Sequence, residues 1–288
     1  MPSSLDCTLC LMRQSLEAAR FASSDTELHE KVVRNVMEMV LQRGFRIPPP
    51  IIGQEIHRVI RKMVNKDPYA QVKRQFNDLL LSQMDALRKK ITASETPFET
   101  AVRIAIAGNM IDCALRANLQ PSLVDEAVAA ALQEPIVGDL AGFQKWVEKS
   151  DKILYLLDNC GEIVCDRLLI EQMFPKKVTA AVRGMPVLND ATLEDAKYVG
   201  LTEIVPVISN GNDAIGTILE QCSEEFTEHF YSADLIISKG LGNYETLITA
   251  PPEKTTRPIA FLFKAKCAFI AQFSGTKLGD TVIFLKNV

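Results

Sequence analysis

Short apolar segments alternate with helical ones from Lys152 onward, and this pattern constrains the fold more than any other feature. The first segment, ILYLL at 153–157, is a continuous apolar run that ends at Asp158, which is typical of a buried parallel strand. Similar runs occupy 177–182, 203–208, 234–238, 259–263 and 281–285, and helices are expected at 163–173, 193–199, 214–222 and 244–248. The alternation predicts an α/β fold with a doubly wound, mostly parallel sheet in a Rossmann-like, three-layer arrangement.

The first 150 residues follow a different pattern, because their apolar side chains recur at helical spacing and no alternating β-branched run is found. Capping residues, Gly44 and several prolines divide this part into separate helices. Helices are expected at 9–21, 25–43, 51–63 and 97–115, with another starting at 67 and a short one after 121. We therefore expect two domains, an all-helical bundle over residues 1–148 and an α/β domain over residues 149–288.

Net charge and cysteine content limit the kinds of binding partner and the cellular compartment that we expect. The formal net charge is −4, so the chain lacks the basic field that binding to nucleic acid favours. No segment approaches the roughly 20 apolar residues that span a bilayer, and no secretory signal pattern is visible. Seven scattered cysteines, an odd number, suit a reducing compartment. We expect a cytoplasmic protein with a small-molecule partner, and the oligomeric state stays open.

Polar residues follow four consecutive predicted strands. In an open α/β sheet the ligand crevice lies outside these carboxyl ends of the strands, so such residues are the informative ones. They are Asp158, Asn159 and Glu162 after the first strand, Arg183 and Asp190 after the second, Gly211 after the third, and Lys239 and Asn243 after the fourth.

This inventory suits phosphate chemistry with a metal ion. Carboxylate and amide oxygens are hard ligands that Mg²⁺ or Mn²⁺ accepts. Arg183 and Lys239 would bind a phosphate, the arginine as a fork and the lysine as a point charge. A helix expected after Gly211 would offer backbone N–H groups to the same anion. The pattern therefore predicts a site for phosphoryl transfer or phosphate hydrolysis.

A purely structural interpretation of the same residues stands beside the functional one. Asp158-Asn159 is also typical of a turn or a helix N-cap, and Asp190 of a helix cap. Glu162 and Asp166 are four residues apart, and a solvated helix face accounts for at least one of them. The joint placement at one sheet edge favours the functional interpretation.

Four motifs in order resemble the damage-control phosphatase family, formerly a domain-of-unknown-function family with members described as acidic-residue methyltransferases. They are GNMID at 108–112, LDNCGE at 157–162, LNDAT at 188–192 and DLIISKGLGNYE at 234–245. The resemblance implies a helical domain on an α/β domain and a divalent Mn, Co, Ni or Mg ion held by Asp158, Asn159 and Asp190. It also implies a small phosphate ester as substrate, such as a sugar phosphate or a damaged phospho-metabolite.

The resemblance further implies roles for other residues. Lys239 would contact the phosphate with Asn243 nearby, and Asn109 and Asp112 would reach the site from the helical domain. The CTLC motif at 7–10 resembles the microbial branch of the family; Cys7 and Cys10 are equally well explained as small core residues, or by a redox or auxiliary metal role.

The sequence leaves alternatives open for both the catalytic mechanism and the functional class of the protein. Glu162 would act as the base, or Asp158 as the nucleophile, and neither water attack nor a phospho-enzyme is favoured. A non-catalytic metal- or nucleotide-binding protein would use the same ligands. An S-adenosylmethionine-dependent carboxyl methyltransferase is disfavoured because the turn after the first strand holds a single glycine, Gly161.

Overall fold

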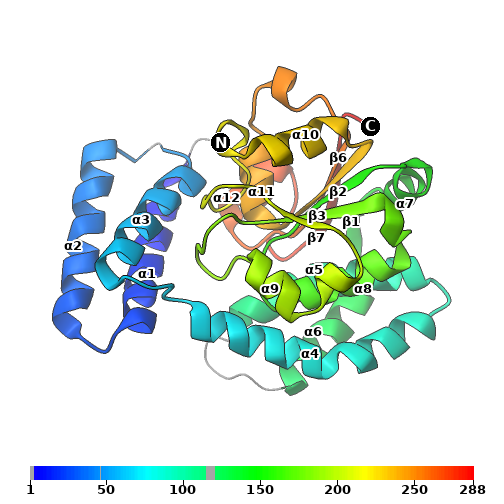
Figure 1. Cartoon of the computed structure of the whole chain (residues 1–288), viewed down its shortest axis with the longest axis horizontal. Helices are drawn as coiled ribbons and strands as arrows, with labels where there is room; N and C mark the ends of the chain where they lie inside the picture. The colour runs from blue at the N-terminus through cyan, green and yellow to red at the C-terminus, as the bar shows by residue number, and fades with distance from the viewer. Residues whose placement is uncertain (1–2, 46, 115–120) are drawn as a thin grey trace.

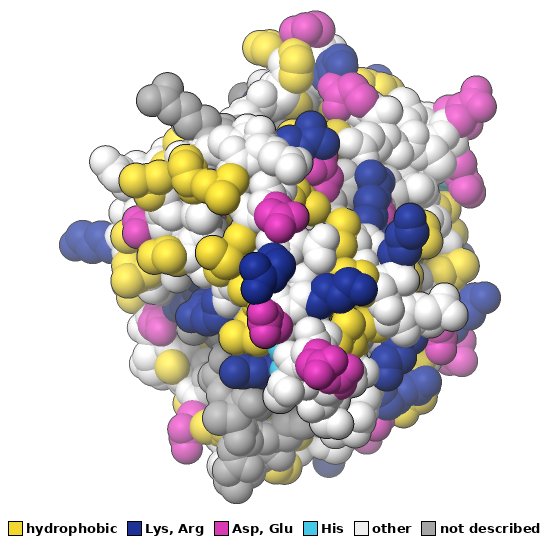
Figure 2. Space-filling view, turned by 90° about the vertical axis from the view of Figure 1, so that its left-hand side faces the viewer, with side chains coloured by type: hydrophobic (Ala, Val, Ile, Leu, Met, Phe, Trp, Pro, Cys, Tyr) yellow, Lys and Arg dark blue, Asp and Glu magenta, His cyan; other side chains and the backbone are white. Residues whose placement is uncertain are grey.

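The computed structural model describes residues 3–45, 47–114 and 121–288, without the side chains of residues 110–114. The first three helices, α1 (Leu5–Ala22), α2 (Thr26–Arg43) and α3 (Pro49–Val64), form a unit beside the sheet (Figure 1). Most of their buried side chains belong to one hydrophobic cluster, which Tyr69 and Leu188 join from outside these helices. The face of the molecule on this side mixes charged side chains with exposed hydrophobic ones (Figure 2). Leu9 of α1 and Leu41 of α2 are exposed hydrophobic residues of this unit.

A seven-stranded sheet forms the centre of the rest of the molecule, in the order β1-β7-β6-β5-β2-β3-β4. All neighbouring strands are parallel except β6 and β7, which are antiparallel. The strands are β1 (Ile136–Gly138), β2 (Ile153–Leu156), β3 (Val178–Val182), β4 (Val207–Ser209), β5 (Leu235–Lys239), β6 (Ile259–Lys264) and β7 (Thr281–Lys286).

Alternating side chains of the strands point into two hydrophobic layers. Along β2, Tyr155 belongs to the larger cluster, whereas Leu154 and Leu156 belong to the smaller one on the opposite face. The larger cluster is covered by α4 (Ala70–Thr92), α5 (Pro97–Ala114), α6 (Pro121–Gln133), α7 (Leu140–Lys149), α8 (Glu162–Gln172) and α9 (Leu193–Tyr198). The smaller is covered by α10 (Glu224–Ser232), α11 (Gly240–Leu247) and α12 (Ala268–Ser274). None of the helices within the described ranges is long and apolar enough to cross a membrane.

The predicted fold class is confirmed, since a helical N-terminal region precedes an α/β region with a mostly parallel sheet. The helix expected at 214–222 is wrong, because only a 3-10 turn at Leu219–Gln221 forms there. The amides of Asn210 and Asn212 accept hydrogen bonds from the backbone N–H groups of Asn212 and Ala214, and these local turns compete with a helix. Strand β1 and helices α7, α10 and α12 were not expected.

The larger hydrophobic cluster runs across residue 148, where a domain boundary was expected. Leu80 and Ile104 from the helical region share it with Tyr155 and Leu168 from the α/β region. Strand β1 lies before residue 148 and yet pairs with β7 at the C-terminus. Helices α4 to α7 are therefore one layer of the α/β fold.

This shared core predicts how fragments of the chain fold. Residues 149–288 alone should show no cooperative thermal unfolding, because they lack β1 and the helices α4 to α7 that complete the larger cluster. Residues 66–288 lack only helices α1 to α3 and keep both hydrophobic clusters on the sheet, so this fragment should unfold cooperatively. Circular dichroism in the near ultraviolet during heating measures both. A cooperative transition in the shorter fragment would establish residue 148 as a true domain boundary.

Candidate active site

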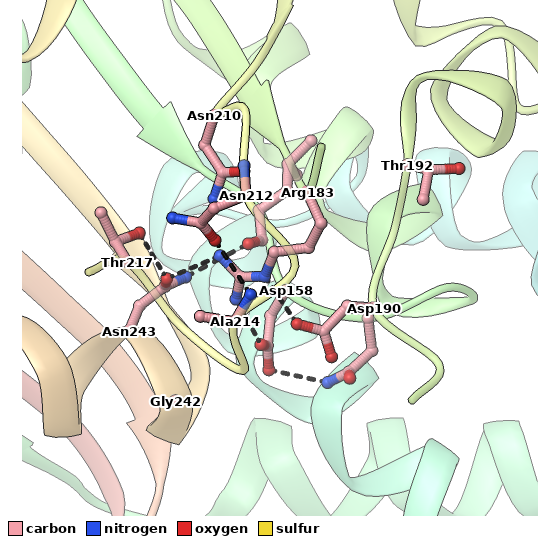
Figure 3. Close-up of polar contacts among 12 residues, drawn as sticks. Asp158, Arg183, Asp190, Thr192, Asn210, Asn212, Ala214, Thr217, Gly242 and Asn243 are labelled. Atoms are coloured by element: carbon pink, nitrogen blue, oxygen red, sulfur yellow. Dashed lines mark hydrogen bonds and ion pairs between the residues drawn. The ribbon is translucent and has the colours of Figure 1, made fainter. Parts of the chain in front are cut away.

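The carboxyl ends of the central strands bring together Asp158, Arg183, Asp190 and Asn243 (Figure 3). Asp158 follows β2 closely, and its carbonyl oxygen accepts a hydrogen bond from the N–H of Ala191 at 2.8 Å. An isolated antiparallel bridge pairs Asn159 with Asp190. Backbone hydrogen bonds thus hold the Asp158-Asn159 turn against Asp190, as the strand-end pattern predicts.

Gly240 makes a close backbone approach to this turn. Because Leu156 of β2 lies beside Ser238 of β5, Asp158 and Gly240 leave the sheet next to one another. Gly240 has a φ of +74°, and an added Cβ would lie only 1.9 Å from Oδ2 of Asp158. Only glycine therefore leaves room for the Asp158 carboxylate here.

Two side-chain amides link the carboxylates of Asp158 and Glu162. Asn109 of α5 donates from Nδ2 to Asp158 Oδ2 at 2.9 Å and to Glu162 Oε2 at 2.5 Å. Asn159 donates from Nδ2 to the same two oxygens at 2.7 and 3.0 Å. The helical region therefore does reach the site through Asn109, whereas the side chain of Asp112 lies outside the described part of the structure.

Arg183 lies between the two aspartates and Asn243 (Figure 3). Its Nε donates to Asp190 Oδ2 at 2.6 Å, and its Nη1 donates to Asn243 Oδ1 at 2.9 Å. Asn243 Oδ1 also accepts a hydrogen bond from Thr217 Oγ1 at 2.9 Å. The Nη2 group is 3.6 Å from Asp158 Oδ1 and is buried without a hydrogen-bond partner among the described residues. Buried donors are almost always paired, so this group marks a place for an acceptor.

Lys239 occupies a buried charge network instead of an open edge. Its Nζ donates to Glu162 Oε1 at 2.7 Å, Asp166 Oδ1 at 2.5 Å and the carbonyl oxygen of Ala105 at 2.9 Å. The side chains of all three charged residues are 0% exposed. Tyr155 also donates to Asp166 Oδ1, at 2.7 Å.

This environment differs from two sequence expectations. Lys239 was expected to reach a phosphate, but its three donors already have protein acceptors. Glu162 and Asp166 were assigned at least in part to a solvated helix face, and both are buried. The anions beside Lys239 are therefore the carboxylates of Glu162 and Asp166, and Glu162 also accepts hydrogen bonds from two amides.

The protein environment disfavours unpaired negative charge at this edge. Burial raises the pKa of Asp158 well above its usual value, and the charges of Glu162 and Asp190 raise it further, against Arg183 and Lys266. Burial likewise raises the pKa of Asp190, although Arg183 opposes this shift. An additional positive charge would favour the ionised carboxylates.

Two other residues change the expected phosphate-binding set. The N–H of Gly211 donates to Ser209 Oγ at 3.0 Å and no helix begins there, so the expected helix N-terminus for an anion is wrong. Lys266 was missed, although it follows the end of β6 as the other candidates follow their strands. Lys266 is half-buried, and its ammonium donates a hydrogen bond to the carbonyl oxygen of Asn109. Its positive charge lowers the pKa of Asp158.

The donor set fits a hard divalent cation completed by water. No group of three or more His, Cys, Asp and Glu side chains in the described ranges has the geometry of a metal site. Asp158 and Asp190 supply two carboxylates and Asn159 an amide. Mg²⁺-type ions typically bind through one or two carboxylates and keep several waters, so this set suits them.

Several known proteins are similar to this chain in sequence, and one of them is similar in fold. A model of the damage-control phosphatase ARMT1-like domain matches residues 3–282. An uncharacterized protein from Methanocaldococcus jannaschii is 37% identical over 96% of this chain and 93% of its own length. The damage-control phosphatase of Archaeoglobus fulgidus is 31% identical over 96% of both chains. A DUF89 family protein from Pyrococcus horikoshii, solved by crystallography, is 30% identical with a TM-score of 0.88 over 99% of both chains.

The buried network makes a prediction about Lys239. Lys239→Met should lower the free energy of unfolding by roughly 3–5 kcal/mol, because it leaves two buried carboxylates without their cation. Lys254→Met is the control, since it removes an exposed ion pair with Glu220 and should change stability little. Urea unfolding followed by circular dichroism measures both. Equal midpoints for Lys239→Met and the wild type would contradict the network.

Proposed function

The chain belongs to the damage-control phosphatase ARMT1-like family, and from that premise we propose that it is a divalent-metal-dependent phosphatase for monoesters of small metabolites, such as sugar phosphates or damaged phospho-metabolites. The observation that carries the proposal is the Nη2 group of Arg183, which is buried 3.6 Å from Asp158 Oδ1 and has no hydrogen-bond partner among the described residues. A phosphate oxygen is a suitable acceptor for it.

Asp158, Asn159 and Asp190 would hold the metal in this proposal. The bridge between Asn159 and Asp190 keeps the two carboxylate-bearing segments together, so the ligands need little rearrangement. When bound, a Mn, Co, Ni or Mg ion would polarise the phosphate and lower the pKa of a bound water.

Arg183 and Lys266 would bind the phosphate. Arg183 is fixed by Asp190 and Asn243, which leaves Nη2 pre-oriented toward the space beside Asp158. Lys266 is half-buried next to Asn109 and adds positive charge on the same side. Asn243 contributes by orienting Arg183, and Lys239 by holding Glu162.

Glu162 would orient the two amides that contact Asp158. Its Oε2 accepts from both Asn109 and Asn159, and its Oε1 accepts from Lys239. A carboxylate with all these partners suits a positioning role better than proton transfer. Asp158 then remains the candidate nucleophile, or the carboxylate beside an attacking water. Acid quenching of a reaction with ³²P-labelled substrate, followed by hydroxylamine treatment, separates a phospho-aspartate from direct water attack.

The proposal predicts metal-dependent turnover that depends on Asp190. With p-nitrophenyl phosphate, activity should appear with Mn²⁺, Co²⁺, Ni²⁺ or Mg²⁺ and disappear with EDTA. Asp190→Asn should lower kcat/KM by about 10²-fold or more, because it weakens both the metal site and the anchor of Arg183. Asp151→Asn, at a carboxylate that is 86% exposed, should match the wild type.

Two results would contradict the phosphatase proposal. Metal binding without turnover across a panel of phosphorylated sugars and damaged cofactors would favour a binding protein. Turnover that persists in EDTA, or in Asp190→Asn, would exclude this metal site from the reaction.

A further inference from the structure

Arg61 of α3 joins two loops that come from different strands. Its Nη1 donates to the carbonyl oxygen of Pro186 at 2.5 Å, and its Nη2 donates to Asp213 Oδ2. Pro186 lies in the turn 186–190, which ends at the candidate ligand Asp190. Asp213 lies in the loop 210–218 that follows β4. The Arg61 side chain is only 14% exposed, so it is an internal link between these segments.

The turn 186–190 needs support from outside itself. Leu188 has a φ of +47°, in the left-handed region that residues other than glycine seldom adopt. Its side chain is 9% exposed and packs in the hydrophobic cluster of α1 to α3, with Ile52 and Ile56 of α3. Packing on α3 and the hydrogen bond from Arg61 therefore hold the turn that carries Asp190.

The loop 210–218 is held by the same helix. Gln54 donates to Asp213 Oδ1 at 2.8 Å, and Arg58 donates to both of its carboxylate oxygens. Ile215 fits against Gly53, where an added Cβ would lie 2.6 Å from Cδ1 of Ile215. This loop presents Thr217 to Asn243, the residue that fixes Arg183.

We infer that Arg61 is a positioning residue that sets Asp190 against the Arg183–Asn243 pair, although it contacts none of them. The segment just before the turn also meets the loop 210–218 directly, because the N–H of Gly184 donates to the carbonyl oxygen of Asn212 at 2.7 Å. The planar guanidinium of Arg61 adds a second link, because it bonds to both Pro186 and Asp213. The inference rests on the proposed function, because it assumes a metal at Asp158 and Asp190.

Arg58 provides a matched control on the same helix. It is also an arginine bonded to Asp213, but its side chain is 51% exposed and, among the described residues, none of its hydrogen bonds reaches the turn 186–190. A variant of Arg58 therefore removes contacts to the loop 210–218 alone. A variant of Arg61 removes the link between both loops.

The test is calorimetric titration of Mn²⁺ alone into the full chain, with turnover of p-nitrophenyl phosphate as a second measurement. Arg61→Ala should bind Mn²⁺ roughly 10–100-fold more weakly, the usual effect of losing a group that supports a metal ligand. Arg58→Ala should bind within about threefold of the wild type, while both variants keep the wild-type circular dichroism. If Arg61→Ala does not fold, Arg61→Lys takes its place, because one ammonium lacks the fork that serves both acceptors.

The outcomes separate the inference from the proposed function. Wild-type affinity in a folded Arg61 variant overturns the inference and leaves the proposed function intact. An equal loss in Arg58→Ala also overturns it, since the effect would then come from Asp213 alone. Absence of Mn²⁺ binding by the wild type overturns the proposed metal site itself.

Discussion

Negative charge buried at one edge of the sheet is the constraint on which the site depends. Asp158, Glu162, Asp166 and Asp190 are 7%, 1%, 0% and 2% exposed. Buried carboxylates are stable only with cations or several hydrogen bonds. Lys239 forms hydrogen-bonded ion pairs with Glu162 and Asp166, and Arg183 forms one with Asp190. Asp158 has amide donors, whereas the nearest guanidinium nitrogen is 3.6 Å away. It is therefore the carboxylate with most to gain from an additional cation.

The helical region completes this network, so the site belongs to the whole chain. Helix α5 supplies the amide of Asn109 to Asp158 and the carbonyl oxygen of Ala105 to Lys239. Helix α3 holds the turn and the loop on either side of Arg183. Without the helical region, Lys239 would lose the carbonyl oxygen of Ala105 as an acceptor. The turn 186–190 and the loop 210–218 would lose their hydrogen bonds to α3.

The sequence predicted this fold well where one rule governs many residues. Parallel strands end at one edge, so Asp158, Asp190 and Asn243 converge there as expected. The prediction failed for side chains that can form hydrogen bonds either with nearby backbone or with residues distant in the sequence. Asn210 and Asn212 bond to nearby backbone instead of permitting a helix, and Lys239 finds carboxylates four residues apart on a buried helix. Burial of Glu162 and Asp166 depends on α5 covering α8, which spacing along one helix does not reveal. The three-residue strand β1 is too short to give a periodic signal.

We propose that a divalent cation completes the carboxylate cluster at Asp158 and Asp190. The most direct test is an anomalous difference map from a crystal soaked in Mn²⁺, collected near the manganese absorption edge. If the cation binds there, one strong peak is expected roughly 2.0–2.6 Å from oxygens of both aspartates. A peak elsewhere in the chain, or none beside these two carboxylates, would contradict it.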